Sequence, residues 1–186
     1  MWWAQLLNNV VALLGNGAGG GGGSFESIAT ATGTGSSGTI TFSSIPSTYK
    51  HLQIRIQTLG TAAGAETWLT LNGSTTGYTQ HKLWGNGTSV YADGLTGGAN
   101  ALIGWYIGTE TTYPTVSIID IHDYASTTKN KTIRGITGID KNGSGYVGMI
   151  SSLWQNTAAV NSISLVVNGT NFATTTKIAL YGIKGE

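Results

Sequence analysis

The sequence predicts an all-β domain over residues 25–186, an antiparallel β-sandwich and most simply a jelly roll. Apolar residues recur at every second position in several segments, as they do in half-buried strands. Glycine-rich turns separate these segments, and after residue 25 no stretch follows the helical period. Short strands joined by such turns are typical of sandwiches, and we expect about ten of them.

Residues 1–14 form an apolar peptide ahead of this domain. They match the spacing of one face of an amphipathic helix at Trp3, Leu6, Leu7, Val10, Val11 and Leu14, with Trp2 beside it. So short a helix is marginal in water, so the peptide requires a surface to cover it. We expect an anchor into a partner or a self-associating helix cluster. The alternatives are docking on its own domain and interfacial membrane insertion, which no basic flank supports.

Residues 15–24, GNGAGGGGGS, form a flexible linker between the peptide and the domain. Ten such residues span about 16–19 Å as a random coil. No lysine or arginine precedes Lys50, so the positive region of a signal peptide is missing. The chain is therefore organised as a peptide, a tether and a β domain.

The strand candidates follow the linker in order. They contain Ile40 and Phe42; Leu52, Ile54 and Ile56; Trp68, Leu69 and Leu71; Ile119 and Ile121; Ile163, Leu165 and Val167; and Ile178 and Leu180. A further run holds Ile133, Ile136 and Ile139 and is interrupted by glycine, which predicts a bulge or a close backbone approach. The turns at 142–145 and 168–169 predict hairpins or tight corners.

The composition suits a protein that lies against other subunits or binds sugars better than a freely circulating cytosolic enzyme. Charged residues make up 9% of the chain, against about 25% in ordinary soluble domains. The Lys and Arg residues are scattered and nearly balanced by acids, so we expect no nucleic-acid partner. The absence of cysteine excludes disulfides and cysteine-based zinc sites.

No pattern of catalytic residues stands out. Asp120 and His122 lie two apart and share a strand face, but two neighbouring ligands do not make a metal site. The eight acids offer no obvious pair for glycoside hydrolysis, and no Gly-x-Ser-x-Gly turn is present. We therefore expect neither an enzyme nor a cofactor.

Four aromatic residues in the looser segments are the candidates for contact with a ligand or a partner: Tyr78, Trp84, Tyr91 and Tyr113. Tyrosine and tryptophan combine a large apolar area with a polar group, which suits sugar platforms and protein interfaces. The alternative for each of them is core filling.

Several stretches resemble small virion proteins of tailed bacteriophages, many of them from aquatic phages. They are SFESIAT at 24–30, ITFSSIPSTYKHLQIR at 40–55, DIHDYA at 120–125, NKT at 130–132, LWQ at 153–155 and ALYGIKG at 179–185. The resemblance covers nearly all of residues 24–185. It implies a structural protein on the exterior of a phage particle.

Two roles fit that implication. In the first, the N-terminal peptide plugs into the tail, baseplate or head, and the β domain projects as a fibre or spike that binds host-surface glycan. In the second, the chain is a capsid decoration (cement) protein that clamps subunits of the major capsid protein. We expect a homotrimer in either role, because a weakly charged, disulfide-free domain gains stability by association.

Overall fold

The computed structural model describes residues 23–185, so the predicted anchor peptide lies outside the described residues. The described chain folds into twelve strands and contains no helix. The strands are β1 (Phe25–Thr32), β2 (Thr39–Phe42), β3 (His51–Thr58), β4 (Gly64–Leu71), β5 (Tyr78–Gly85), β6 (Val90–Gly98), β7 (Ala101–Ile107), β8 (Thr115–His122), β9 (Lys131–Asp140), β10 (Gly145–Trp154), β11 (Ile163–Val167) and β12 (Lys177–Ile183).

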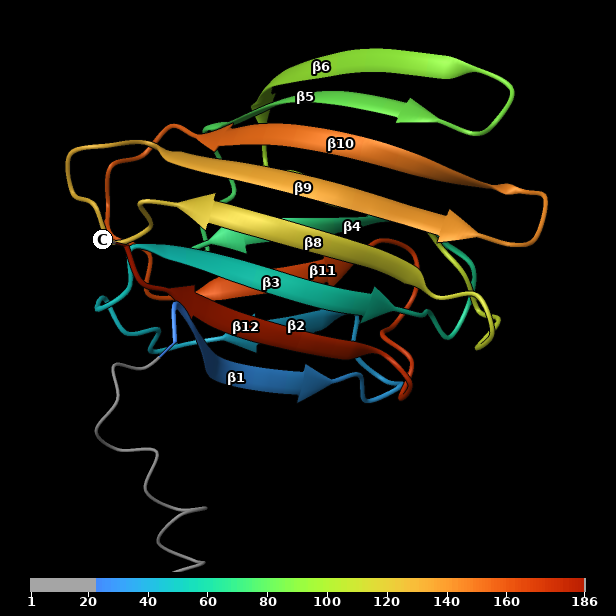
Figure 1. Ribbon diagram of the computed structural model, residues 1–186, viewed down its shortest axis with the longest axis horizontal. Helices are drawn as coiled ribbons and strands as arrows, with labels where there is room; N and C mark the ends of the chain where they lie inside the picture. The colour runs from blue at the N-terminus through green and yellow to red at the C-terminus, as the bar shows by residue number, and fades with distance from the viewer. Residues whose placement is uncertain (1–22, 186) are drawn as a thin grey trace, which may run out of the picture.

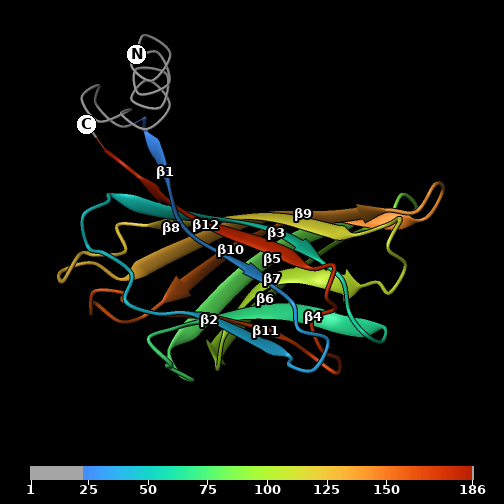
Figure 2. The same ribbon diagram turned by 90° about the horizontal axis from the view of Figure 1, so that it is seen from below.

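The strands form two antiparallel sheets packed face to face, which confirms the predicted β-sandwich (Figures 1 and 2). The eight-stranded sheet has the order β1-β12-β3-β8-β9-β10-β5-β6, and the four-stranded sheet has the order β2-β11-β4-β7. In Figure 1 the larger sheet faces the viewer and β2, β4 and β11 lie behind it.

The strand order is that of a jelly roll with two added hairpins. Without β5–β6 and β9–β10, the sheets read β1-β12-β3-β8 and β2-β11-β4-β7. The chain then alternates between the two sheets except at β4 and β7, which pair within the smaller sheet, and it closes β12 next to β1, as the Greek keys of a jelly roll require. Both hairpins join the larger sheet beyond β8 and widen it.

The core lies between the inner faces of the two sheets. Alternate residues of β3, β8 and β12 point into it, so Ile54, Ile119 and Leu180 are fully buried. A second, smaller cluster lies under the added hairpins and consists of Leu102, Trp105, Ile139, Tyr146 and Ile150. The Tyr146 hydroxyl donates to the Trp105 carbonyl and accepts the Trp105 amide N–H, so it ties β10 to β7 across the sandwich. Burial raises the pKa of Tyr146 to about 12.

The turn at 142–145 forms the predicted hairpin between β9 and β10. Asn142 and Gly143 both have positive φ values, of 56° and 113°, which asparagine and glycine tolerate best. The Lys141 amide donates to the Ser144 carbonyl and closes the turn. The turn at 168–169 instead carries the chain from one sheet to the other.

Of the two alternatives predicted for the run of Ile133, Ile136 and Ile139, a bulge or a close backbone approach, the structure has the close approach, since a Cβ atom at Gly138 would lie 3.0 Å from the Tyr146 carbonyl oxygen. β9 pairs with β8 and β10 in continuous register, with Gly135 and Gly138 inside the ladder. The register shifts lie elsewhere, in β1, β4 and β5. Strict alternation therefore holds along β9, which buries Ile133 and Ile139 and leaves Ile136 exposed.

The two ends of the described chain lie at the same corner of the larger sheet (Figure 1). The Lys184 amide donates to the Ser24 carbonyl at 3.0 Å. The Glu26 carboxylate accepts a hydrogen bond from the Tyr49 hydroxyl at 3.0 Å and pairs with the Lys184 ammonium. The first residues of β1, an edge strand, are therefore held to the last residues of the chain.

Candidate binding face

The outer face of the eight-stranded sheet carries a row of exposed apolar side chains. The register places Ile118 opposite Ile136, Ile136 opposite Met149, and Met149 opposite Leu83. These four residues come from β8, β9, β10 and β5, and they are 43–58% exposed. Directly opposed residues on one sheet face lie close enough to touch, so the row is continuous.

A second row runs beside the first and is interrupted by glycine. Here Val116 lies opposite Gly138, Gly138 opposite Val147, and Val147 opposite Gly85. Val116 and Val147 are 50% and 61% exposed. The missing side chains at Gly138 and Gly85 leave an open hollow on the sheet surface.

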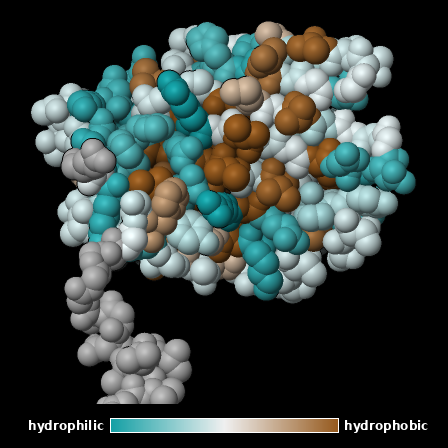
Figure 3. Space-filling view, viewed as in Figure 1, coloured by the Kyte–Doolittle hydropathy of each residue, from teal (hydrophilic) through white to brown (hydrophobic). Residues whose placement is uncertain are grey.

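The two rows together make one patch, which we call the apolar face: Leu83, Val116, Ile118, Ile136, Val147 and Met149. Figure 3 shows apolar side chains gathered over the middle of this sheet, with polar side chains around them. Six half-exposed side chains of this size present on the order of 500 Å² of apolar surface, within the range of the functional patches found on monomers. Antiparallel sheets that face water usually carry polar residues there, so the face indicates a binding surface.

A polar row borders the apolar face on its other side. Gln53, Asp120, Arg134, Ser151 and His81 follow one another across five strands. Gln53 Nε2 donates to Asp120 Oδ1 at 2.8 Å, and Arg55 Nε donates to Gln53 Oε1 at 3.0 Å. Among the described residues, Arg134 takes part in no ion pair. An apolar centre with a hydrogen-bonding margin is the usual anatomy of a protein interface.

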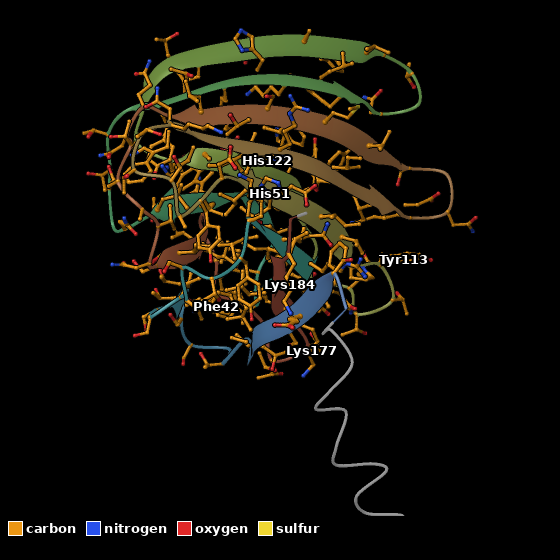
Figure 4. The ribbon with its side chains drawn as sticks, turned by 60° about the vertical axis from the view of Figure 1, so that its left-hand side comes forward. Phe42, His51, Tyr113, His122, Lys177 and Lys184 are labelled. Atoms are coloured by element: carbon orange, nitrogen blue, oxygen red, sulfur yellow. The ribbon has the colours of Figure 1, made fainter. Side chains whose placement is uncertain are left out.

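A cluster of charged groups and histidines lies at the end of β3 and β8. The rings of His51 and His122 approach edge to face, with centroids 5.0 Å apart (Figure 4). His51 Nδ1 accepts the Asp123 amide at 3.0 Å, and burial lowers the pKa of His51. The Lys129 and Lys50 ammonium groups lie 2.7 and 3.0 Å from the Asp123 carboxylate and hold its pKa well below the usual range. These contacts hold the loop between β8 and β9 against the start of β3.

The sequence-predicted aromatic residues separate in the structure. Tyr78 is buried, stacks on Trp154 and accepts the Leu71 amide with its hydroxyl, so its prediction as a surface residue was wrong. Trp84 and Tyr91 do lie together, stacked at 5.2 Å, with Tyr91 43% exposed.

Tyr113, the fourth predicted aromatic residue, is partly buried against the smaller core cluster. No aromatic contact joins it to Trp84 or Tyr91 in the described part of the chain. Binding of host-surface glycan by these side chains stays a prediction.

The apolar face was missed in the sequence because its residues lie in segments that are apolar on both sides. In β8, Ile119 and Ile121 face the core, whereas Val116 and Ile118 occupy the opposite face. The two sets adjoin in the run VSIID at 116–120, which masks the alternation. An apolar residue on the wrong side of an otherwise alternating strand was the available signal.

Residues 23–185 contain no group of three or more His, Asp or Glu side chains that could hold a metal ion. The same residues include no helix long and apolar enough to cross a membrane.

Comparison of the chain with known proteins identifies no family. No family model and no curated protein matches the chain. The solved structures that align to it include galectin LEC-6 from Caenorhabditis elegans, with 10% identity over 84% of this chain and 96% of that chain, at a TM-score of 0.33. The GH43 protein BlXynB (mutant K247S) from Bacillus licheniformis aligns at 9% identity over 79% of this chain and 32% of that one, with a TM-score of 0.32.

A third alignment is to a structure of infectious bursal disease virus, Gt strain. It has 16% identity and a TM-score of 0.14, and it covers 87% of this chain and 42% of the viral one. None of the three similarities is close enough to carry an argument about function.

Proposed function

We propose that this chain is a non-enzymatic structural component of a bacteriophage particle, displayed on its exterior. The observation that carries the proposal is the contiguous apolar face, because a domain that works alone in solvent gains nothing from such a surface. The resemblance of residues 24–185 to small virion proteins supports a phage particle as the assembly. The partners are then other virion proteins of the tail, the baseplate or the capsid.

The fibre and the cement role differ in how many copies one particle carries. A fibre or spike anchored by residues 1–14 is present in at most a few dozen copies, whereas a cement protein approaches the number of major capsid subunits. Quantitative mass spectrometry of purified particles measures this ratio. We expect the chain in the particles at the lower number, and a copy number near that of the capsid protein would select the cement role. Its absence from purified particles would contradict the whole proposal.

The assembly state is open to a separate measurement. We propose a homotrimer, because a weakly charged domain without disulfides gains stability by association. Light scattering of the purified full chain at micromolar concentration is expected to give three times the mass of one chain. A monomer at that concentration would count against the trimer and would leave the copy-number result unaffected.

A further inference from the structure

We propose that, in the free chain, the apolar face is the docking site of the chain's own N-terminal peptide, residues 1–14. The inference deepens the proposed function and rests on it, because an anchor peptide that awaits its partner requires a surface meanwhile. It joins two observations: an apolar peptide that is too short to be a stable helix in water, and an apolar sheet face that none of residues 23–185 covers.

The chemistry of the two surfaces matches. Residues 1–14 contain no charged side chain and nine large apolar ones. The apolar face holds six exposed aliphatic side chains and no charged one. Bringing the two together removes apolar area from water on both sides, at roughly 25 cal/mol per Å².

The dimensions match as well. As a helix, the peptide measures about 17 Å from Trp3 to Leu14. The row from Ile118 to Leu83 crosses four strands and measures about 14 Å. One helical face can therefore cover the row from end to end.

The linker joins the domain at the sheet that carries the apolar face, and it is long enough to reach that face. The described chain enters β1, the edge strand of the same sheet, and the register puts Thr30 of β1 in one lateral row with Ala179, Arg55 and Ile118. Ile118 then lies about 14 Å across the strands and about 14 Å along them from Phe25, a separation of about 20 Å. The ten linker residues extend to about 33 Å, so Leu14 reaches Ile118 without strain.

The second row, in which Gly138 and Gly85 carry no side chain, leaves room for an indole ring. The hollow over Gly138 and Gly85 is lined by Val116, Tyr146 and Val147, among others. It adjoins the apolar face and offers aliphatic walls to a bulky ring. Trp2 and Trp3 are the bulky side chains of the peptide that it would receive.

A second copy of the sheet is a poorer occupant. Three cationic residues at the margin of the apolar face, Arg55, Arg134 and Lys177, outnumber its two carboxylates, those of Asp120 and Asp140, so each face has a net positive margin and two such faces would repel each other. An uncharged peptide meets no such conflict. A short flexible tether also keeps the peptide at a millimolar effective concentration, far above a micromolar second chain.

Disulfide trapping tests the proposal in the full chain, because the natural sequence contains no cysteine. The test variant carries Leu7→Cys with Ile136→Cys, in the apolar face. The matched control carries Leu7→Cys with Thr41→Cys, an exposed residue of the four-stranded sheet. Both positions on the domain are exposed, so folding tolerates cysteine there, and circular dichroism checks it.

We expect a disulfide within one chain to form at least ten times faster in the test variant than in the control, under mild oxidation at low micromolar concentration. Adding Met149→Glu to the test variant is expected to slow trapping several-fold, because it puts a carboxylate in the apolar row. Non-reducing electrophoresis with mass spectrometry gives the result.

Equal rates in the two variants would overturn the proposal. A disulfide between two chains would overturn it as well, in favour of the peptide of a second copy. Either result is independent of the particle composition. Trapping can fail while the chain is found in virions, and trapping can succeed while the chain is missing from them.

Discussion

Lys131 is a buried residue whose side chain connects two loops. Its side chain is fully buried, and its ammonium donates to the carbonyls of Ser126, Lys129 and Thr157 at 2.7, 2.6 and 3.1 Å. These carbonyls belong to the loop before β9 and the loop after β10. Burial lowers the pKa of Lys131, and the three carbonyl dipoles stabilise the charge in place of water.

We expect Lys131→Met to lower the free energy of unfolding by about 2–4 kcal/mol, because it removes the buried donor that three loop carbonyls share. Denaturant unfolding of the full chain measures the loss. Lys129→Met is the matched control, since Lys129 is exposed and its ion pair with Asp123 is worth at most about 1 kcal/mol. Equal losses in the two variants would show that the buried ammonium is not important for stability.

At the scale of single residues, the sequence predicts the core better than the surface. Ile54, Ile119 and Leu180 were assigned to the core from alternation alone, and they are fully buried. Tyr78 was assigned to a loop surface because turn signals precede it, but its contacts with Trp154 and Leu71 are long-range or cross-element and leave no local signature. Lys131 was missed for a similar reason, since its acceptor on Thr157 becomes a neighbour only in the folded chain.

The two added hairpins are the elements that distinguish this jelly roll. β9–β10 packs on the smaller sheet through Trp105, which fits against the backbone of Gly148 on β10. A Cβ atom at Gly148 would lie 2.4 Å from Trp105 Cζ3, so the close approach requires glycine. The hairpin also supplies three residues of the apolar face, namely Ile136, Val147 and Met149.

We expect Gly148→Ala to cost about 1–3 kcal/mol of stability, because Trp105 must move and repack. Thermal unfolding, followed by tryptophan fluorescence, measures both the loss and the repacking. Gly85→Ala is the control on the neighbouring β5, where the nearest contact of a Cβ atom is an ordinary 3.5 Å. That variant is expected to be neutral or slightly stabilising. A Gly148→Ala protein as stable as the control would contradict the packing argument.

Elements with clear alternation could be predicted, and those without it could not. β8, β11 and β12 each combine a buried and a more exposed side in strict order, and β3 does so except at the buried Gln53. β6 is exposed along nearly its whole length and contains three glycines, so nothing in its composition marks a strand. Its pairing with β5 is decided by the sheet, and twelve strands therefore stand where about ten were expected.

At the scale of the whole molecule, the widened sheet is what gives the sandwich its apolar face. In the order without hairpins, β8 would be an edge strand, and Val116 and Ile118 would form a short apolar strip at the margin. The hairpins add β9, β10 and β5 beside them and extend that strip into the apolar face. The sequence could indicate exposed hydrophobic residues there only once this strand order was known.

The corner where the tether enters also determines how the molecule bears load. If residues 1–14 are held and the β domain is pulled, tension enters through Ser24 into β1, which pairs with β12 alone. An edge strand drawn from its end would peel away one hydrogen bond at a time. Contacts at the start of β1 resist that first step. They are the contacts of Glu26 with Tyr49 and Lys184 and the backbone hydrogen bond between Ser24 and Lys184. In the proposed role on a phage particle, these contacts would strengthen the domain at the point where a pull on its N-terminus first acts.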